Sequence, residues 1–143
     1  MHCTALGKAV LAFLPTPRVR AILIRHGMPR QTPRTIVSLP MMDRELARIR
    51  RQGYAIDDIE FEEGVRCVGA PVLDHRGMPI AAVSVSAPVP RMPVARAREV
   101  GAALRAAAAE ISKAIGWKAG SDRQAGDVFP VHAGKPARRS RVG

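Results

Sequence analysis

A cysteine and two serines stand inside two stretches whose other residues are typical of buried β-strands. Cys67 lies in the segment 65–73, and Ser84 and Ser86 lie in the segment 80–87. Small donors and acceptors on an apolar sheet surface suit the binding of a small polar molecule such as a carboxylate or oxo-acid. The alternative is a structural role, because a cysteine in a strand is often a packed core residue and serine is common on exposed sheet faces.

The alternation of residue types predicts how the two strands pair. With an even-numbered loop at the tip of a hairpin, Cys67 lies opposite Ser84 and Val65 lies opposite Ser86. Directly opposed side chains of an antiparallel pair share one face of the sheet. The other face is then apolar apart from Arg66 near its end, and it holds Val68, Ala70, Val72, Ala81, Val83 and Val85.

A carboxylate precedes the hairpin. Asp57 alternates with Tyr54 and Ile56 in a short predicted strand, so we expect it to point away from them and toward the face of Cys67. A helix predicted over residues 4–14 would add backbone N–H groups at its start, which favour an anion. These groups together predict a binding site for a small anionic ligand.

An enzyme with Cys67 as nucleophile is the alternative function. Such an enzyme needs a base within about 3 Å of the thiol. His75 lies eight residues further along the chain, roughly 26 Å away in an extended strand, and His2 or His26 could approach only through tertiary folding. Since the sequence contains no catalytic triad or nucleophile-elbow motif, we expect a binding protein and not an enzyme.

The remaining reactive side chains predict neither a metal site nor a cofactor. Asp57, Cys67 and His2 are possible metal ligands, but they lack the spacing of a metal-binding motif. Cys3 and Cys67 are the only two cysteines, which fits a reduced, cytoplasmic protein without disulfides. No stretch is long and apolar enough to predict a membrane span, so we expect no membrane partner.

The chain is strongly basic, with a net charge of +11. A basic chain is able to approach nucleic acid, and four residues near the C-terminus would contact phosphates without reading sequence: Lys135, Arg138, Arg139 and Arg141. The segment 118–143 has little periodicity and is rich in glycine, proline and arginine, which predicts a disordered basic tail. A solvated terminus with no partner has the same composition.

Periodicity and helix breakers predict the elements that position these groups. Helices are expected over residues 4–14, 16–27, 43–52 and 94–115, with an extended connection over 28–42. Pro71 favours an edge position for the first hairpin strand. The first helix is expected to bury Leu6, Val10, Phe13 and Leu14. The last is expected to bury Val100, Leu104, Ala107, Ala108, Ile111 and Ile115.

Three stretches in this order resemble the IclR family of bacterial transcription regulators: HCTALGKAVLAFLP, IRRQGYAIDDIEFEEGVRCVGAPVLDHRGMPIAAVSVSAP and AAAAEISKAIG. The resemblance is to the effector-binding domain and covers about residues 2–116. It implies an α+β, GAF-like fold, in which an antiparallel sheet is flanked by helices and the ligand lies in a cavity on the sheet. Family members typically act as dimers or tetramers, and they bind DNA through an N-terminal winged helix-turn-helix.

Carried over residue by residue, the resemblance implies seven ligand-binding positions. They comprise two backbone amides at a helix start, one carboxylate, two contacts on one strand and two hydroxyls on the next. In chain order these are Ala5, Leu6, Asp57, Val65, Cys67, Ser84 and Ser86. The implied effector is a small organic acid or a related metabolite.

The sequence begins at the HCTALGKA motif of the family. The winged helix and the first strands of the usual effector-binding domain precede that motif in the family it resembles. We therefore expect residues 1–117 to form an N-terminally truncated effector-binding domain that lacks these strands. On this interpretation the chain is a homodimer or tetramer, and it reaches DNA only through a domain absent from this sequence.

Overall fold

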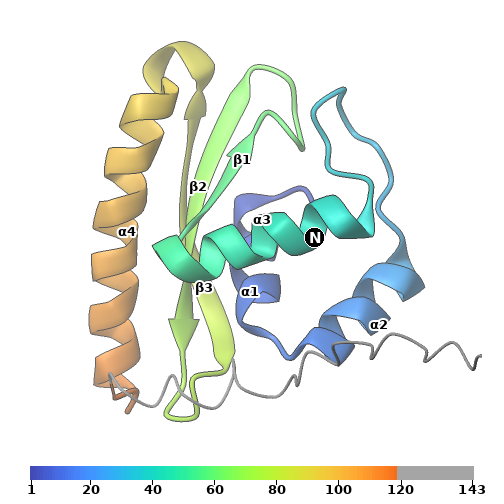
Figure 1. Ribbon diagram of the computed structural model, residues 1–143. Helices are drawn as coiled ribbons and strands as arrows, with labels where there is room; N and C mark the ends of the chain where they lie inside the picture. The colour runs from blue at the N-terminus through green and yellow to red at the C-terminus, as the bar shows by residue number, and fades with distance from the viewer. Residues whose placement is uncertain (119–143) are drawn as a thin grey trace, which may run out of the picture.

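The computed structural model describes residues 1–118, so the tail predicted after Lys118 lies outside the described residues (Figure 1). Four α-helices, three strands and one short 3-10 helix make up the described part. They are α1 (Ala5–Phe13), α2 (Thr16–His26), α3 (Leu39–Gln52), β1 (Ala55–Asp58), β2 (Val65–Leu73), β3 (Pro79–Pro88), η1 (Val89–Arg91) and α4 (Val94–Ala114). The predicted α+β class is confirmed.

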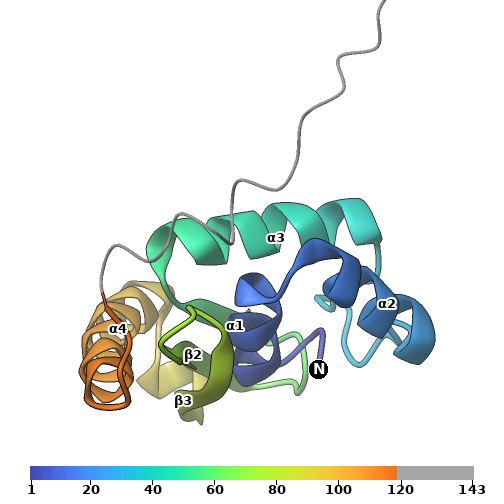
Figure 2. The ribbon, with the colours of Figure 1, turned by 90° about the horizontal axis from the view of Figure 1, so that it is seen from below.

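The strands form an antiparallel sheet in the order β1-β2-β3, with helices on both faces. Figure 2 shows α4 on one side of the sheet and α1 on the other, with α2 beyond α1 and α3 running from near the sheet toward α2. One apolar core lies between α1, α2 and α3, and the two smaller ones lie between the sheet and α4. The face of β2 that carries Cys67 is the face toward α1.

The first helix begins as the sequence predicts but turns a different side toward the core. The Thr4 side chain accepts a hydrogen bond from the Gly7 N–H, which is the geometry of an N-cap. Leu6, expected to be buried, is 42% exposed, whereas Leu11 is fully buried. The predicted buried face of this helix is therefore wrong. Small residues, and not the large ones, lie at the closest contact between α1 and the sheet.

The third helix begins earlier than predicted. It starts at Leu39, so residues 39–42 belong to the helix and not to an extended connection, and Asp43 is not its N-cap. Pro40 lies in the first turn, where a helix tolerates proline because the missing N–H has no intrahelical acceptor there. The predicted end is confirmed: Gly53 is left-handed, with φ of 78°.

The last helix packs its small residues on the sheet. The side chains of Ile111 and Ile115, expected to be buried, are 42% and 44% exposed. The buried residues of α4 are Ala97, Gly101, Ala108 and Ser112. A Cβ on Gly101 would lie 2.4 Å from the Tyr54 ring, so this glycine permits a close approach that a larger residue would prevent.

The predicted register of the hairpin is wrong by two residues. Cys67 pairs with Ser86 and Val65 with Pro88, while Ser84 pairs with Gly69. The loop is odd-numbered, because Leu73 pairs with Pro79, and the pairing shifts between Val72 and Leu73. A shift by two residues leaves every side chain on its predicted face, and the assignment of the faces is therefore correct.

Pro71 lies in the middle strand and not in an edge strand. The pairing of β1 with β2 ends at Ala55 and Gly69, so Pro71 lies beyond the point where β1 stops. At Pro71 the strand has a paired neighbour only in β3. The strand is thus locally an edge at Pro71, and edge positions are where sheets tolerate proline.

Candidate functional site

The sheet brings three of the predicted site residues into one row. Asp57 of β1 pairs with Cys67 of β2, and Cys67 pairs with Ser86 of β3. Since paired residues share a face, the carboxylate, the thiol and the hydroxyl all lie on the face toward α1. The Ser86 Oγ donates a hydrogen bond of 3.0 Å to the Cys67 Sγ.

The start of α1 lies directly on this face at Gly69. A Cβ on Gly69 would lie 3.0 Å from the carbonyl group of Ala5 and 3.1 Å from the Leu6 nitrogen. Ser84 pairs with Gly69, so it lies on the same face, one row further along the sheet than Cys67 and Ser86. The N–H groups of Ala5 and Leu6 belong to the first turn of the helix, where no intrahelical acceptor exists.

The exposure of the predicted residues increases from β1 to β3. Asp57 is buried, Cys67 is half-buried, and Ser84 and Ser86 are exposed. Val65 is half-buried at the end of the same face, opposite Pro88. The predicted residues therefore form a polar surface on the sheet, deep at β1 and accessible from β3.

Asp57 has a structural role that the sequence analysis missed. Its Oδ1 accepts hydrogen bonds from the N–H groups of Glu60, at 2.7 Å, and Phe61, at 3.3 Å. The side chain thus holds the loop after β1, where Ile59 has a positive φ of 65°. Burial raises the pKa of Asp57, although the two backbone hydrogen bonds oppose this shift. The run of acids DDIEFEE was the only sequence signal for such a loop.

A buried ion-pair network next to Asp57 was also missed. Lys8 of α1 is fully buried, and its Nζ donates to the Ile56 carbonyl at 2.7 Å and to Glu45 Oε1 at 3.1 Å. It also donates to the Glu60 carboxylate, whose other oxygen has no partner among the described residues. The network fastens α1 to α3 and to the loop after β1. A lone lysine in the apolar run ALGKAVLAF was its sequence signal.

The pKa values of the two glutamates in the network are shifted in opposite directions. Burial raises the pKa of Glu60, and Lys8 only partly offsets this effect. Burial also acts to raise the pKa of Glu45, but hydrogen bonds and charge from Arg48 and Lys8 outweigh it, and the net pKa is lowered. Glu45 is therefore the firmly ionised partner, and Glu60 is the one closer to protonation.

The Cys67 thiol lacks the properties of an activated nucleophile. Burial raises its pKa, the hydrogen bond from Ser86 opposes this shift, and the charge of Asp57 adds to it. A raised pKa reduces the thiolate fraction, which is the reactive form. His75, the histidine nearest in sequence, lies in the hairpin loop beyond the far end of β2.

Residues 1–118 contain neither a metal-binding cluster nor a membrane-spanning helix. In this part of the chain no group of three or more His, Cys, Asp or Glu side chains is arranged to hold a metal ion. No helix of the described residues is long and apolar enough to cross a membrane.

The fold is an α+β domain whose antiparallel sheet is covered by helices on both faces. The family model described as "Bacterial transcriptional regulator IclR C-terminal" matches residues 1–113, and the chain belongs to this family. The resemblance found in the sequence is thereby confirmed.

Curated relatives are transcription regulators. The transcriptional repressor IclR of Escherichia coli K12 is 39% identical over 116 residues, which cover 81% of this chain and 42% of the relative. The repressor AllR of Klebsiella pneumoniae is 37% identical over 122 residues, which cover 85% of this chain and 45% of the relative. The chain thus spans less than half the length of these curated relatives.

Solved structures of the family share the fold. IclR of Thermotoga maritima matches with a TM-score of 0.77 and 38% identity, covering 81% of this chain and 47% of that one. The C-terminal domain of E. coli KdgR matches with a TM-score of 0.74 and 40% identity, covering 81% of this chain and 71% of that one.

Proposed function

We propose that this chain is the effector-sensing part of an IclR-type regulator and binds a small organic carboxylate on the sheet face under α1. The observation that carries the proposal is the row of Asp57, Cys67 and Ser86 beside the first turn of α1. Polar groups from three strands and a helix start converge there on an otherwise apolar surface, as in many small-molecule sites.

Each group has a distinct role in this proposal, and the role of Asp57 is to hold the loop after β1 beside the site. The N–H groups of Ala5 and Leu6 receive the carboxylate, because the first turn of a helix offers donors without intrahelical acceptors and a partial positive charge. The hydroxyls of Ser84 and Ser86 bind the polar groups of the ligand, since both side chains are exposed. Val65 and the uncharged Cys67 thiol supply the less polar surface between them.

A relative supports a carboxylate as the ligand class. The inducer-binding domain of a PobR double mutant from Acinetobacter was solved in complex with 3-hydroxybenzoic acid, and it matches this chain with a TM-score of 0.70 and 29% identity. We propose that the whole regulator is a cytoplasmic dimer or tetramer. In it, ligand binding would change the DNA affinity of a DNA-binding domain that is not part of this sequence.

Calorimetric titration of the chain with small oxo-, hydroxy- and aromatic acids tests the binding step. Each hydroxyl contributes about 1 kcal/mol through its hydrogen bond, so Ser84→Ala and Ser86→Ala should each weaken binding about fivefold. Ser38→Ala is a matched control, because the Ser38 side chain makes no capping hydrogen bond to α3. Equal affinity in all three variants, or no binding by the folded chain, would contradict the proposal.

A further inference from the structure

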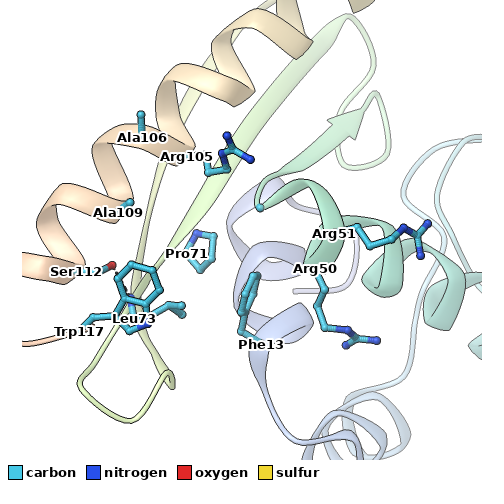
Figure 3. Close-up of a pocket in the computed structure, with 11 residues that line it drawn as sticks. Phe13, Arg50, Arg51, Pro71, Leu73, Arg105, Ala106, Ala109, Ser112 and Trp117 are labelled. Atoms are coloured by element: carbon cyan, nitrogen blue, oxygen red, sulfur yellow. Dashed lines mark hydrogen bonds between the residues drawn. The ribbon is translucent and has the colours of Figure 1, made fainter. Parts of the chain in front are cut away.

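A second cavity lies at the other end of the sheet, away from the polar face described above. It has a volume of about 440 Å³ and opens between α4, the C-terminal ends of α1 and α3, and the part of β2 beyond the last residue paired with β1 (Figure 3). Cavities of this size hold small organic ligands. None of the seven predicted site residues lines it, so it is separate from the proposed effector site.

The interior surface of this cavity is apolar and partly aromatic. Pro71 and Leu73 of β2 form its floor, with Ala106 and Ala109 of α4 on one wall. Figure 3 shows the rings of Phe13 and Trp117 among the side chains that line the cavity, with Trp117 next to Leu73. Two aromatic rings in an apolar lining favour an aromatic ligand, because aromatic groups gain from stacked or edge-to-face contacts.

The charged groups around this cavity have one sign. Arg50, Arg51 and Arg105 line it, and no acidic side chain of the described residues does. Arg50 donates a hydrogen bond of 2.9 Å to the Ala12 carbonyl at the rim. The Arg105 stem lies across Gly53, where a Cβ would approach it to 2.5 Å.

The C-terminus of α3 accounts for the clustering of these arginines. Helix C-termini carry a partial negative charge that nearby cations offset; Arg50 and Arg51 are in the last turn of α3, and the Arg105 stem lies against Gly53, its C-cap. Arg105 comes from α4, is exposed and lines the cavity. It is therefore accessible to a ligand with a single negative charge.

Trp117 adds an unsatisfied donor to the same wall. Its indole N–H is buried and has no hydrogen-bond acceptor among the described residues. A buried donor without an acceptor is unfavourable by about 1–3 kcal/mol.

We propose that this cavity is a second ligand site, which binds a planar aromatic carboxylate with its ring between Phe13 and Trp117 and its carboxylate on Arg105. The site is separate from the effector site on the sheet face, because none of the effector-site residues lines the cavity. A flat, apolar body with one anionic group matches both the lining and the charge.

The single tryptophan of the chain allows a direct test with all 143 residues present. We would titrate 2-naphthoate and its neutral analogue 2-naphthamide while following the one indole N–H signal by ¹H–¹⁵N NMR. Naphthoate should shift the signal in a saturable manner, and the amide should bind at least tenfold more weakly. Arg105→Gln should weaken naphthoate binding at least tenfold, and Ala109→Leu, which fills the cavity, should abolish it.

Matched variants distinguish binding in this cavity from binding elsewhere on the chain. Arg98→Gln removes a positive charge from α4 outside the cavity, and the double variant Ser84→Ala with Ser86→Ala removes the hydroxyls of the effector site; neither should change the affinity. Loss of the shift in the serine variant would place the ligand at the effector site and overturn the proposal. So would equal effects of Arg98→Gln and Arg105→Gln, retained binding in folded Ala109→Leu, or a signal that moves with protein concentration alone.

Discussion

Replacement of Lys8 by methionine is the sharpest test of how α1 is held on the sheet. Lys8 is fully buried and is shared by Glu45, Glu60 and the Ile56 carbonyl. Methionine has a similar length and no charge, so Lys8→Met preserves the packing and removes the cation. The Glu60 carboxylate is then left buried next to Glu45 without a positive partner.

The expected loss of stability follows from this burial. Removing one partner of a buried ion pair costs about 3–5 kcal/mol, since the remaining charge stays desolvated. That is a large part of the roughly 5–15 kcal/mol by which a typical domain is stable. Glu45 keeps its hydrogen bonds from Arg48, so most of the loss should come from Glu60.

The raised pKa of Glu60 predicts how the stability of Lys8→Met changes with pH. The folded-state pKa of Glu60 is raised above its ordinary value of 4.5 by burial, and removal of Lys8 raises it further. The folded state then holds a proton that the unfolded state has lost, so stability falls as pH rises above 4.5. Lys8→Met should therefore be most destabilised relative to the wild type near neutral pH, and the difference should shrink as the pH is lowered toward that ordinary value.

Urea unfolding followed by circular dichroism measures these differences. Lys8→Met combined with Glu60→Gln should recover much of the stability at neutral pH, because the uncompensated charge is gone. Lys113→Met is the control: Lys113 is exposed and pairs with Glu110 on the surface of α4, so its loss should cost less than about 1 kcal/mol. A Lys8→Met chain as stable as this control, or no recovery with Glu60→Gln, would refute the reasoning.

Three further variants test other contacts. Gly69→Ala should destabilise the fold by about 1–3 kcal/mol in urea unfolding and weaken ligand binding, because its Cβ would lie 3.0 Å from the Ala5 backbone. Ser112→Ala should cost about 1–3 kcal/mol in the same assay, since the buried Leu73 N–H loses its acceptor at 2.9 Å. Hydrogen bonds from backbone N–H groups, foremost that of Met78, lower the pKa of Asp74 and so stabilise the folded state above its ordinary pKa of 3.8. The wild type should lose this contribution to stability as the pH falls below 3.8. Asp74→Asn should remove that part of the acid dependence.

Side-chain faces on the strands were predictable from sequence, whereas strand register was not. The period of two in a strand assigns each residue to a face even when the pairing is wrong by two residues. Cys67 and Ser86 therefore share a face, although Ser84 was the expected partner of Cys67. The register depends on the loop, where the Asp74 carboxylate accepts from the Arg76 and Met78 N–H groups, and an odd loop length was not evident from residue type.

Helix faces were less predictable because small residues make the closest contacts here. The expected stripes followed the large apolar residues, yet Leu6 and Ile111 are exposed. Gly101 lies against the Tyr54 ring and Gly69 against the first turn of α1. Hydrophobic periodicity weights large side chains and therefore misses a helix that packs through glycine and alanine. The partners of Lys8 are 37 to 52 residues away, and no local pattern predicts such contacts.

The position of α1 connects both proposed ligand sites to the buried ion-pair network. Its first turn lies on Gly69 beside the effector site, Lys8 fastens its middle, and Phe13 at its end lines the second cavity. A nine-residue helix is about 13 Å long, so loosening its middle should displace both ends. Folded Lys8→Met should therefore bind more weakly at both sites, and addition of Glu60→Gln should restore both together. Restoration of stability without restoration of binding would show that Lys8 acts only on the fold and not on the position of the helix.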